Sequence, residues 1–554
     1  MNKSETVKFI RIIQSEHEDY WQNKASEMKK FRDVYETKFW RTLDYDASMI
    51  RVETPDAYTY IESYIASLFT RAPAVVIGKD VAANEGTPAN PEAAQAIANR
   101  WLYQKREQIE NASRLALIYD YSALKLIPRK SDKMLDKCEV VAVPPWEVIV
   151  DRDAGSPLQQ RYVGHTYFLT VADAKERFGA KKFTAIPKLD YFDEYGPSGA
   201  MPRYNGQARQ SIDDLPDSYL YIKVVELYDL IADKVYFWTP QWQNGDELLD
   251  SEEIPLRTYD DAPLTPIQLL YYSRIPDSPM EGISAMGRVY DQFYEKNILR
   301  TYWANSVRRD SRQYIYKEGT MDEESLAKIT AGVDGAMIAV DNDSLDGVIR
   351  EVGITPISSN FDRYSNYIEA DITRGSVIQA FAGQPTKASA TEITAIASYA
   401  ASEMGKLARE RDNLIEGITN CYLRFIFLLS EEGQKAVVEA GGRAVVITPS
   451  DIDAQFKIAA LDQGSQPLAD ALKKQNLVAL LPTLQSLGVP PALLLEEVVR
   501  AYELPKTFTD AAAAAMGQET PDGPVRAPTG AAASRLEGGP TEQMNSAAQI
   551  VNKL

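Results

Sequence analysis

The sequence predicts a mainly helical α+β protein, and three features of its pattern support this fold class. An apolar repeat with a period of about 3.5 residues runs through 393–428, which is typical of a long helix. Two further helical patterns, 282–312 and 360–381, flank a short strand-rich segment. Bunched β-branched residues at 140–150 and 221–237 predict strands in the first half of the chain.

The N-terminal part is expected to contain three helices. Aromatic and aliphatic residues recur at helical intervals over 5–40, and a second helical pattern, 56–71, ends just before a proline. A third pattern covers 92–118, and the predicted strands come after it. Between these strands, 196–217 is rich in Gly, Pro, Ser and Asp, which predicts an exposed loop.

The strand-rich segment between the two flanking helices predicts a small α/β module. Its strand-like fragments are 314–316, 336–340 and 348–352, separated by turn residues.

Four arginines gather near the end of the first flanking helix, at Arg300, Arg308, Arg309 and Arg312. Cations in a last helical turn interact favourably with the helix dipole and pair with nearby carboxylates. If copies of this helix surround an axis, the same residues form stacked rings of positive charge. The sequence leaves both interpretations open.

The long helix pattern over 393–428 is interrupted only by Arg411. Ser389 and Glu392 form a capping-box pattern at its start, and Gly433 stands where the helix can stop. At roughly 1.5 Å per residue such a helix spans on the order of 60 Å. We expect it either to pass between domains or subunits, or to form the core of one large helical domain.

Beyond this helix, the sequence predicts two further helices at 467–487 and 491–504. The last part of the chain, dominated by Ala, Gly, Pro and Thr, is expected to be a mobile tail with a short helix at 510–516.

Composition narrows the functional classes. The chain has 554 residues and 45% hydrophobic residues, enough for several domains with real cores. Its formal net charge of −19 predicts an overall surface that repels nucleic acid, which argues against a sequence-reading DNA binder. Cys138 and Cys421 lie in apolar patterns, so we expect both to be buried and reduced, with no disulfide. No apolar run long enough for a membrane span and no signal peptide is present, so we expect a soluble protein made in a cytoplasm.

Sequence motifs for catalysis are absent. The chain contains no phosphate-binding loop, dinucleotide fingerprint, nucleophile elbow or zinc-binding helix motif. His17 and His165 lie far apart in the sequence, and each is expected to be structural. The segment 341–347 has a superficial likeness to a calcium loop, but Leu345 stands at a ligand position, so we expect a turn. We therefore expect no catalytic residue, cofactor or metal site.

Seven fragments carry a resemblance to a known family through their order and spacing. They are YTYIESYIASLFTRAPAVVI at 58–77, the run 119–128, PPWEVIVDRDA at 144–154, VADAKERFG at 171–179, VVELYD at 224–229, EGISAMGRVYDQFYEKNILR at 281–300 and ATEITAIASYAASEMGKL at 390–407. Over roughly its first 430 residues, the chain resembles the portal proteins, or head-to-tail connectors, of tailed bacteriophages, particularly those of short-tailed phages.

This resemblance implies a phage portal fold that assembles as a cyclic ring, commonly of about twelve subunits, at one capsid vertex. The regions it implies are a wing at 1–281, stem helix 1 at 282–312, a clip at 313–359, stem helix 2 at 360–379, a tunnel loop at 380–388, a long wing helix at 389–430, a crown at 431–505 and a flexible tail at 506–554.

The resemblance also implies a structural function without enzymatic activity. The ring would be a channel for double-stranded DNA during packaging and ejection, independent of DNA sequence. The terminase large subunit would dock on it, and later a tail adaptor, while the major capsid and scaffolding proteins would surround it. It would assemble in the host cytoplasm and reside in the virion, without a membrane. An acidic tunnel with few cationic rings would bind DNA weakly and let it slide.

The candidate tunnel-facing residues under this resemblance lie in the two stem helices and in the loop after them. They are Arg300, Arg308, Arg309, Arg312, Arg363, Arg374, Gln384 and Lys387. Two alternatives remain open. Instead of a portal protein, the chain could be another ring-forming head–tail adaptor, or a soluble cytoplasmic enzyme with an unrecognised acid–base pair.

Overall fold

The computed structural model describes a large part of the chain. The described residues are 3–41, 43, 49–79, 90–129, 131–179, 220–241, 247–258, 261–309, 314–316, 318–319, 321–331, 341, 349–351, 359–374, 390–431, 433–440, 443–453 and 456–461. The chain divides into two compact units, 1–465 and 466–554, and the second lies outside the described residues. The first unit is α+β, with about half of its described residues in helices, which confirms the predicted fold class.

An N-terminal helix packs on a five-stranded antiparallel sheet. Helix α1 (Lys3–Tyr35) places Ile10 and Ile13 against Val225 and Leu227 of that sheet. The strands, in spatial order, are β4 (Val148–Val150), β5 (Tyr162–Thr170), β6 (Tyr221–Asp229), β7 (Lys234–Trp238) and β8 (Asp250–Glu253). The predicted helix over 5–40 and the strands within 140–150 and 221–237 are thus confirmed.

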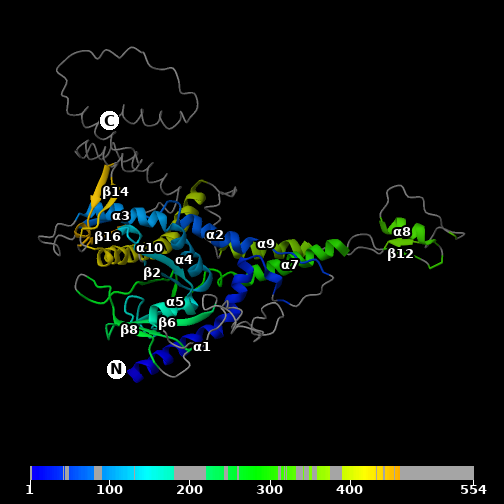
Figure 1. Ribbon diagram of the computed structural model, residues 1–554. Helices are drawn as coiled ribbons and strands as arrows, with labels where there is room; N and C mark the ends of the chain where they lie inside the picture. Colours follow the sequence, from blue (N-terminus) through cyan, green and yellow to red (C-terminus); the bar gives the residue numbers. More distant parts are fainter. Residues whose placement is uncertain are drawn as a thin grey trace, which may run out of the picture. The chain divides into compact units, whose positions relative to one another are not determined.

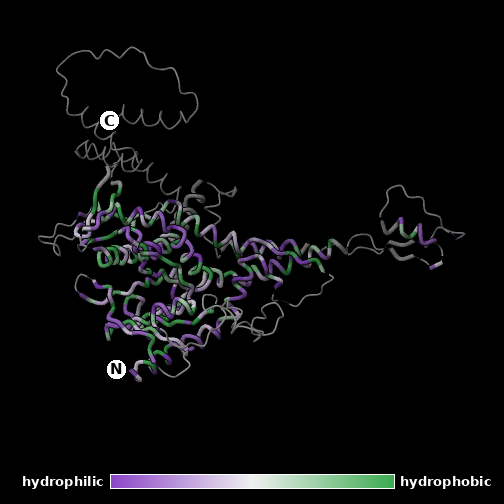
Figure 2. The backbone as a smooth tube through the Cα atoms, viewed as in Figure 1, coloured by the Kyte–Doolittle hydropathy of each residue, from purple (hydrophilic) through white to green (hydrophobic). Residues whose placement is uncertain are grey.

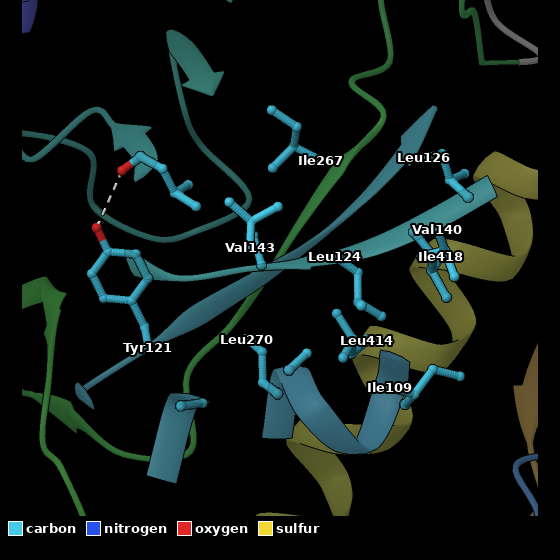
Figure 3. Packing of buried hydrophobic residues seen from close by; sticks show 14 of the residues in the cluster. Ile109, Tyr121, Leu124, Leu126, Val140, Val143, Ile267, Leu270, Leu414 and Ile418 are labelled. Atoms are coloured by element: carbon cyan, nitrogen blue, oxygen red, sulfur yellow. Dashed lines mark hydrogen bonds between the residues drawn. The ribbon is translucent and has the colours of Figure 1, made fainter. Parts of the chain in front are cut away.

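A second sheet forms the centre of the core. Its spatial order is β3 (Cys138–Val143), β2 (Ser122–Pro128) and β9 (Ile267–Leu270), all antiparallel. Helix α10 (Ala390–Leu429) lies against this sheet, and Figure 3 shows Leu414 and Ile418 of the helix directed toward Leu124 and Val140. All four side chains are buried, so this contact removes a large apolar area from water.

Helix α10 confirms the predicted long helix, and most of its apolar seam belongs to the core. Met404, Ile418 and Cys421 are buried within the first unit, so the described part of this apolar seam packs in the core. The helix ends at Leu429, and Gly433, with a φ of +90°, follows in a turn. The predicted cap at Ser389 lies outside the described residues.

The helix predicted over 92–118 is wrong as a single element. It is divided at Lys105 into α3 (Pro91–Gln104) and α4 (Arg106–Tyr119). No proline or glycine marks the break. Tertiary packing explains it, because Trp101 stacks on Tyr422 of α10 at a centroid distance of 4.0 Å, whereas the Gln108 side chain accepts a hydrogen bond from the Ala142 amide of β3 at 3.1 Å.

The first flanking helix begins later than predicted. It starts at Tyr290 and not at Gly282. Gly282 is instead the last residue of β11 (Ser278–Gly282), which forms a hairpin with β10 (Arg274–Ile275). A Cβ at Gly282 would lie 2.2 Å from the Asp120 carbonyl oxygen, so only glycine fits this close approach. The helix cannot extend backward because the chain is held there by Ser284, whose hydroxyl donates to the Ile118 carbonyl at 2.7 Å.

Three strands after α10 were not predicted. Strands β14 (Ala436–Ala440) and β15 (Arg443–Ile447) form a hairpin, and β16 (Phe456–Ala460) pairs antiparallel with β1 (Val75–Lys79). The last pairing ties residues after the long helix to the N-terminal part of the chain. The predicted loop at 196–217, the predicted helices at 467–487 and 491–504 and the predicted tail all lie outside the described residues.

The remaining helices include α2 (Asp56–Leu68), which confirms the helix predicted over 56–71. Helix α5 (Val171–Phe178) begins after Thr170, whose side chain caps it by accepting a hydrogen bond from the Asp173 amide.

Within the described residues, no helix combines the length and hydropathy that a membrane span requires.

Candidate functional site

The candidate site is a pair of helices, α7 (Tyr290–Arg309) and α9 (Ser359–Arg374), which lie side by side (Figure 1). Polar contacts join them. The Tyr364 hydroxyl donates to Glu295 at 3.1 Å, and Lys296 Nζ lies 3.4 Å from a Glu369 carboxylate oxygen. Figure 2 shows hydrophobic and hydrophilic residues interspersed along both helices. The return helix predicted from 360 is confirmed over 359–374, and its predicted end lies outside the described residues.

An extended segment at 50–54, called the strap below, runs along α7. Three buried polar side chains of α7, each four residues from the next, hold it by its backbone. The Asn297 side chain accepts from the Thr54 amide at 2.9 Å, Thr301 accepts from the Val52 amide at 3.0 Å, and Asn305 accepts from the Ile50 amide at 2.9 Å and donates to the Ile50 carbonyl at 2.8 Å.

The strap fits α7 because two repeats match in length. Four helical residues rise by roughly 6 Å, and two extended residues span about 6.6 Å. Asn297, Thr301 and Asn305 therefore meet every second residue of the strap. All three side chains are buried. Their polar atoms form the backbone hydrogen bonds that a neighbouring strand would otherwise supply to an extended segment. The arrangement fixes the position of α7 relative to the N-terminal part of the chain.

Replacing Asn297 with leucine is expected to loosen the strap. The Thr54 amide would lose its acceptor in a buried position, which costs about 1–3 kcal/mol of unfolding free energy. Hydrogen exchange followed by mass spectrometry should show faster exchange at 50–54. Leucine at Asn366, an exposed residue of α9, is the matched control and should leave that exchange unchanged. Unchanged exchange in both variants would contradict the anchoring role of Asn297.

Side chains are described for two of the predicted tunnel-facing residues. Arg300 is exposed on α7, with its Cζ atom 5.7 Å from the Trp303 ring centroid, and Arg363 is exposed on α9. The backbones of Arg308 and Arg309 end α7 and that of Arg374 ends α9, but their side chains lie outside the described part, as do Arg312, Gln384 and Lys387 entirely.

The segment between the two helices contains a small sheet and a helix. Strands β12 (Tyr314–Tyr316) and β13 (Ile349–Glu351) pair antiparallel, which confirms the predictions at 314–316 and 348–352. Helix α8 (Glu323–Ala331) was not predicted. Asp322 caps it by accepting from the Ser325 amide at 3.2 Å, a signal that the sequence contains. The strand predicted at 336–340 lies outside the described residues.

Sequence reasoning missed a buried ionic cluster between the two large sheets. Lys125 of β2 lies 2.8 Å from the Glu226 carboxylate of β6, and its Nζ atom lies 3.1 Å from His165 Nδ1 of β5. Tyr228 donates a hydrogen bond to the same Glu226 carboxylate. All four residues are buried. Charged residues inside the apolar strand sequences SALKLIP and VVELYD are the signal that could have identified the pair.

Burial and charge determine the protonation states in this cluster. Burial lowers the pKa of Lys125 and lowers that of His165 well below its usual range, with the Lys125 charge acting in the same direction on His165. Burial alone would raise the pKa of Glu226, but the Lys125 ammonium and two hydrogen bonds hold it below its usual range. The cluster is therefore an ion pair that joins the two sheets beside a neutral histidine.

His17 is buried in α1 and contacts the backbone of another part of the chain. Its Nε2 atom lies 2.8 Å from the Trp146 carbonyl oxygen. Because a carbonyl only accepts hydrogen bonds, Nε2 carries the hydrogen. Burial lowers the pKa of His17 to about 4. The unfolded chain, with a histidine pKa of about 6.5, therefore binds a proton between pH 6.5 and 4 that the native state does not.

This difference predicts a loss of stability in acid. The full contribution of neutral His17 is present above about pH 6.5, and unfolding free energy on the order of 3 kcal/mol is lost as the pH falls toward 4. Replacing His17 with glutamine should reduce the difference between urea-unfolding free energies at pH 7 and pH 4.5. Because His165 titrates in the same direction, part of the difference should remain. An identical pH dependence in variant and wild type would refute the role of His17.

Cys138 and Cys421 are buried and free, as predicted, and burial raises the pKa of each thiol to about 12. No group of three or more His, Cys, Asp or Glu side chains in the described ranges is arranged to hold a metal ion. Of the predicted turn at 341–347, only Asp341 is described.

Comparisons with known proteins add no assignment. No protein-family model matches the chain, and no curated protein matches it in sequence.

Proposed function

We propose that this chain is a portal-type structural protein, one subunit of a closed ring of about twelve copies through which double-stranded DNA passes. The observation that carries the proposal is the order α7, β12, α8, β13, α9 and α10, in which two adjacent helices flank a small module and a long helix follows. A portal subunit requires this order for its two stem helices, its clip and its wing helix.

Two properties of the helix pair support the proposal. The strap and the buried Asn297, Thr301 and Asn305 hold α7 in a fixed position, which a channel wall requires. The pair also carries exposed aromatic side chains, which suit contact with neighbouring subunits. In the proposed ring, α7 and α9 line the channel.

The charge of the chain fits passage of DNA better than tight binding. Each phosphate held by Lys or Arg adds affinity that salt weakens and that opposes sliding. The chain carries 79 Asp and Glu against 60 Lys and Arg, and the resulting net charge of −19 opposes such contacts. Under the proposal the exposed Arg363 contacts the phosphate backbone without reading the sequence.

The proposed partners follow from the same arrangement. The module between α7 and α9 would receive the terminase large subunit during packaging and a tail adaptor afterwards, while the major capsid and scaffolding proteins would surround the ring. The proposal includes no catalytic role. The Lys125–Glu226 pair does not favour the enzyme alternative, because both side chains are buried and paired with each other.

The mass of the assembly in solution tests the proposal. Size-exclusion chromatography with light scattering of the purified chain should give one discrete species of about twelve times 61.9 kDa. A monomer or dimer at all concentrations would contradict a ring. A closed ring of a different subunit number would retain the proposal with that number corrected.

A further inference from the structure

We infer that the α7–α9 pair carries two complementary flanks through which one copy of this chain binds the next, with Arg300 of one copy against Glu295 and the tyrosines beside it on its neighbour. The inference rests on the proposed function, which requires contacts between copies. It goes further by identifying the surfaces and the charge pair that make them.

Two adjacent residues of α7 mark the two flanks. Glu295 and Lys296 lie roughly 100° apart around the helix. Both contact α9, but through different residues, Tyr364 and Glu369 respectively. Helix α9 therefore lies between the directions of Glu295 and Lys296, and one flank of the pair opens on each side.

Helical spacing assigns further residues to each flank. Arg300, Trp303 and Val307 follow Lys296 by four, seven and eleven residues and so share its side of α7. We call Lys296, Arg300, Trp303 and Val307 the arginine flank. Tyr302 follows Glu295 by seven residues, and on α9 Tyr367 and Asp371 follow Tyr364 by three and seven. We call Glu295, Tyr302, Tyr364, Tyr367 and Asp371 the tyrosine flank.

Both flanks expose large side chains to solvent. Tyr302 and Tyr367 are 53% and 60% exposed on the tyrosine flank, and Val307 is 54% exposed on the arginine flank. Grouped aromatic residues with a polar surround are typical of protein–protein contacts, in which Tyr, Trp and Arg supply most of the binding energy.

The charges of the flanks are complementary. Lys296 is satisfied within its own chain by Asp56 at 3.1 Å and Glu369 at 3.4 Å. Arg300 contacts the Trp303 ring, and none of the ion pairs between described residues includes it. The tyrosine flank offers what a guanidinium binds best, which is the Glu295 carboxylate beside aromatic faces.

A second copy of the same chain is the partner that this arrangement fits. The Arg300 guanidinium and the Glu295 carboxylate lie on opposite flanks of one helix pair. The contact between two copies is therefore heterologous, because each copy contributes a different flank to it. Each copy can bind one neighbour on either side, which produces a closed ring if the rotation between copies closes.

Charge reversal tests the pairing. Arg300→Glu and Glu295→Arg each place like charges together at every contact, so each variant alone should lower the assembled fraction by about tenfold or more in light scattering. The doubly exchanged chain, Arg300→Glu with Glu295→Arg, should assemble again. An equimolar mixture of the two single variants should also assemble, because copies that alternate around the ring bring opposite charges together at every contact between them.

The matched control is Arg409→Glu, which makes the same charge change at an exposed residue of α10, outside the α7–α9 pair. It should assemble like wild type. Assembly of the mixture from two non-assembling variants excludes misfolding as the cause.

The outcomes separate this inference from the proposed function. If wild type forms rings and the single variants do so equally well, the flank pairing is wrong and the ring remains. If the single variants fail and neither the double variant nor the mixture recovers, the pairing of Arg300 with Glu295 is wrong. If wild type is monomeric, the proposed function and the inference both fail.

Discussion

Replacing Lys125 with methionine is expected to lower the unfolding free energy of the first unit by about 3–5 kcal/mol, because removing one member of a buried ion pair leaves the other charge uncompensated. Lys125 Nζ lies 2.8 Å from Glu226, and both side chains are almost fully buried. Methionine has a similar length and fills the same space, so the loss reports the charge rather than a cavity. Urea unfolding followed by far-UV circular dichroism measures it.

A second substitution distinguishes the ion pair from general damage to the core. Adding Glu226→Gln to Lys125→Met removes the buried carboxylate charge, so the double variant should lose less free energy than the sum of the single variants. Methionine at Lys234, an exposed residue of β7 in the same sheet as Glu226, should change stability by no more than about 0.5 kcal/mol. Additive losses in the double variant would contradict a direct pair.

Replacing Arg411 with methionine is expected to cost about 2–4 kcal/mol, since a buried guanidinium with several hydrogen bonds would be lost. Arg411 is fully buried in α10. Its Nε and Nη2 atoms donate to Asp412 at 2.8 and 2.6 Å, and its Nη1 atom donates to the Leu68 carbonyl at the end of α2. A cation at this end of α2 also interacts favourably with the helix dipole.

The effect of Arg411→Met should be greatest at the end of α2. The Leu68 carbonyl would lose its donor, so hydrogen exchange at the Phe69 amide, which closes the last turn onto Ile65, should accelerate. Asp412 is partly exposed and can take up water, which keeps the cost below that of a fully buried pair. Methionine at Arg409, exposed on the same helix, is the control and should leave stability and exchange unchanged. Equal effects of the two variants would contradict the anchoring role.

The sequence predicted elements whose signals are local. The apolar repeat identified α10, and only Arg411 interrupted it. The partner that explains the interruption, the carbonyl of Leu68, lies hundreds of residues away and leaves no trace in the repeat. For the same reason the pairing of β16 with β1 was missed, because neither short strand reveals its partner. The break at Lys105 depends on what α3 and α4 each pack against.

The candidate site was predictable as a pair of flanking helices but not as a surface. The positions of α7 and α9 follow from periodicity, and Arg300 was identified as a cation near the end of the first helix. The strap was missed, although the regular spacing of Asn297, Thr301 and Asn305 is visible in the sequence, because the backbone it binds lies some 250 residues earlier. The flanks became distinguishable only when contacts with α9 oriented α7.

Electron microscopy of the purified full-length chain tests the central claim most directly. We predict end-on views of uniform rings, of about twelve subunits, around an axial hole wide enough for B-form DNA. Compact particles without a hole, or monomers and dimers alone, would contradict the portal account.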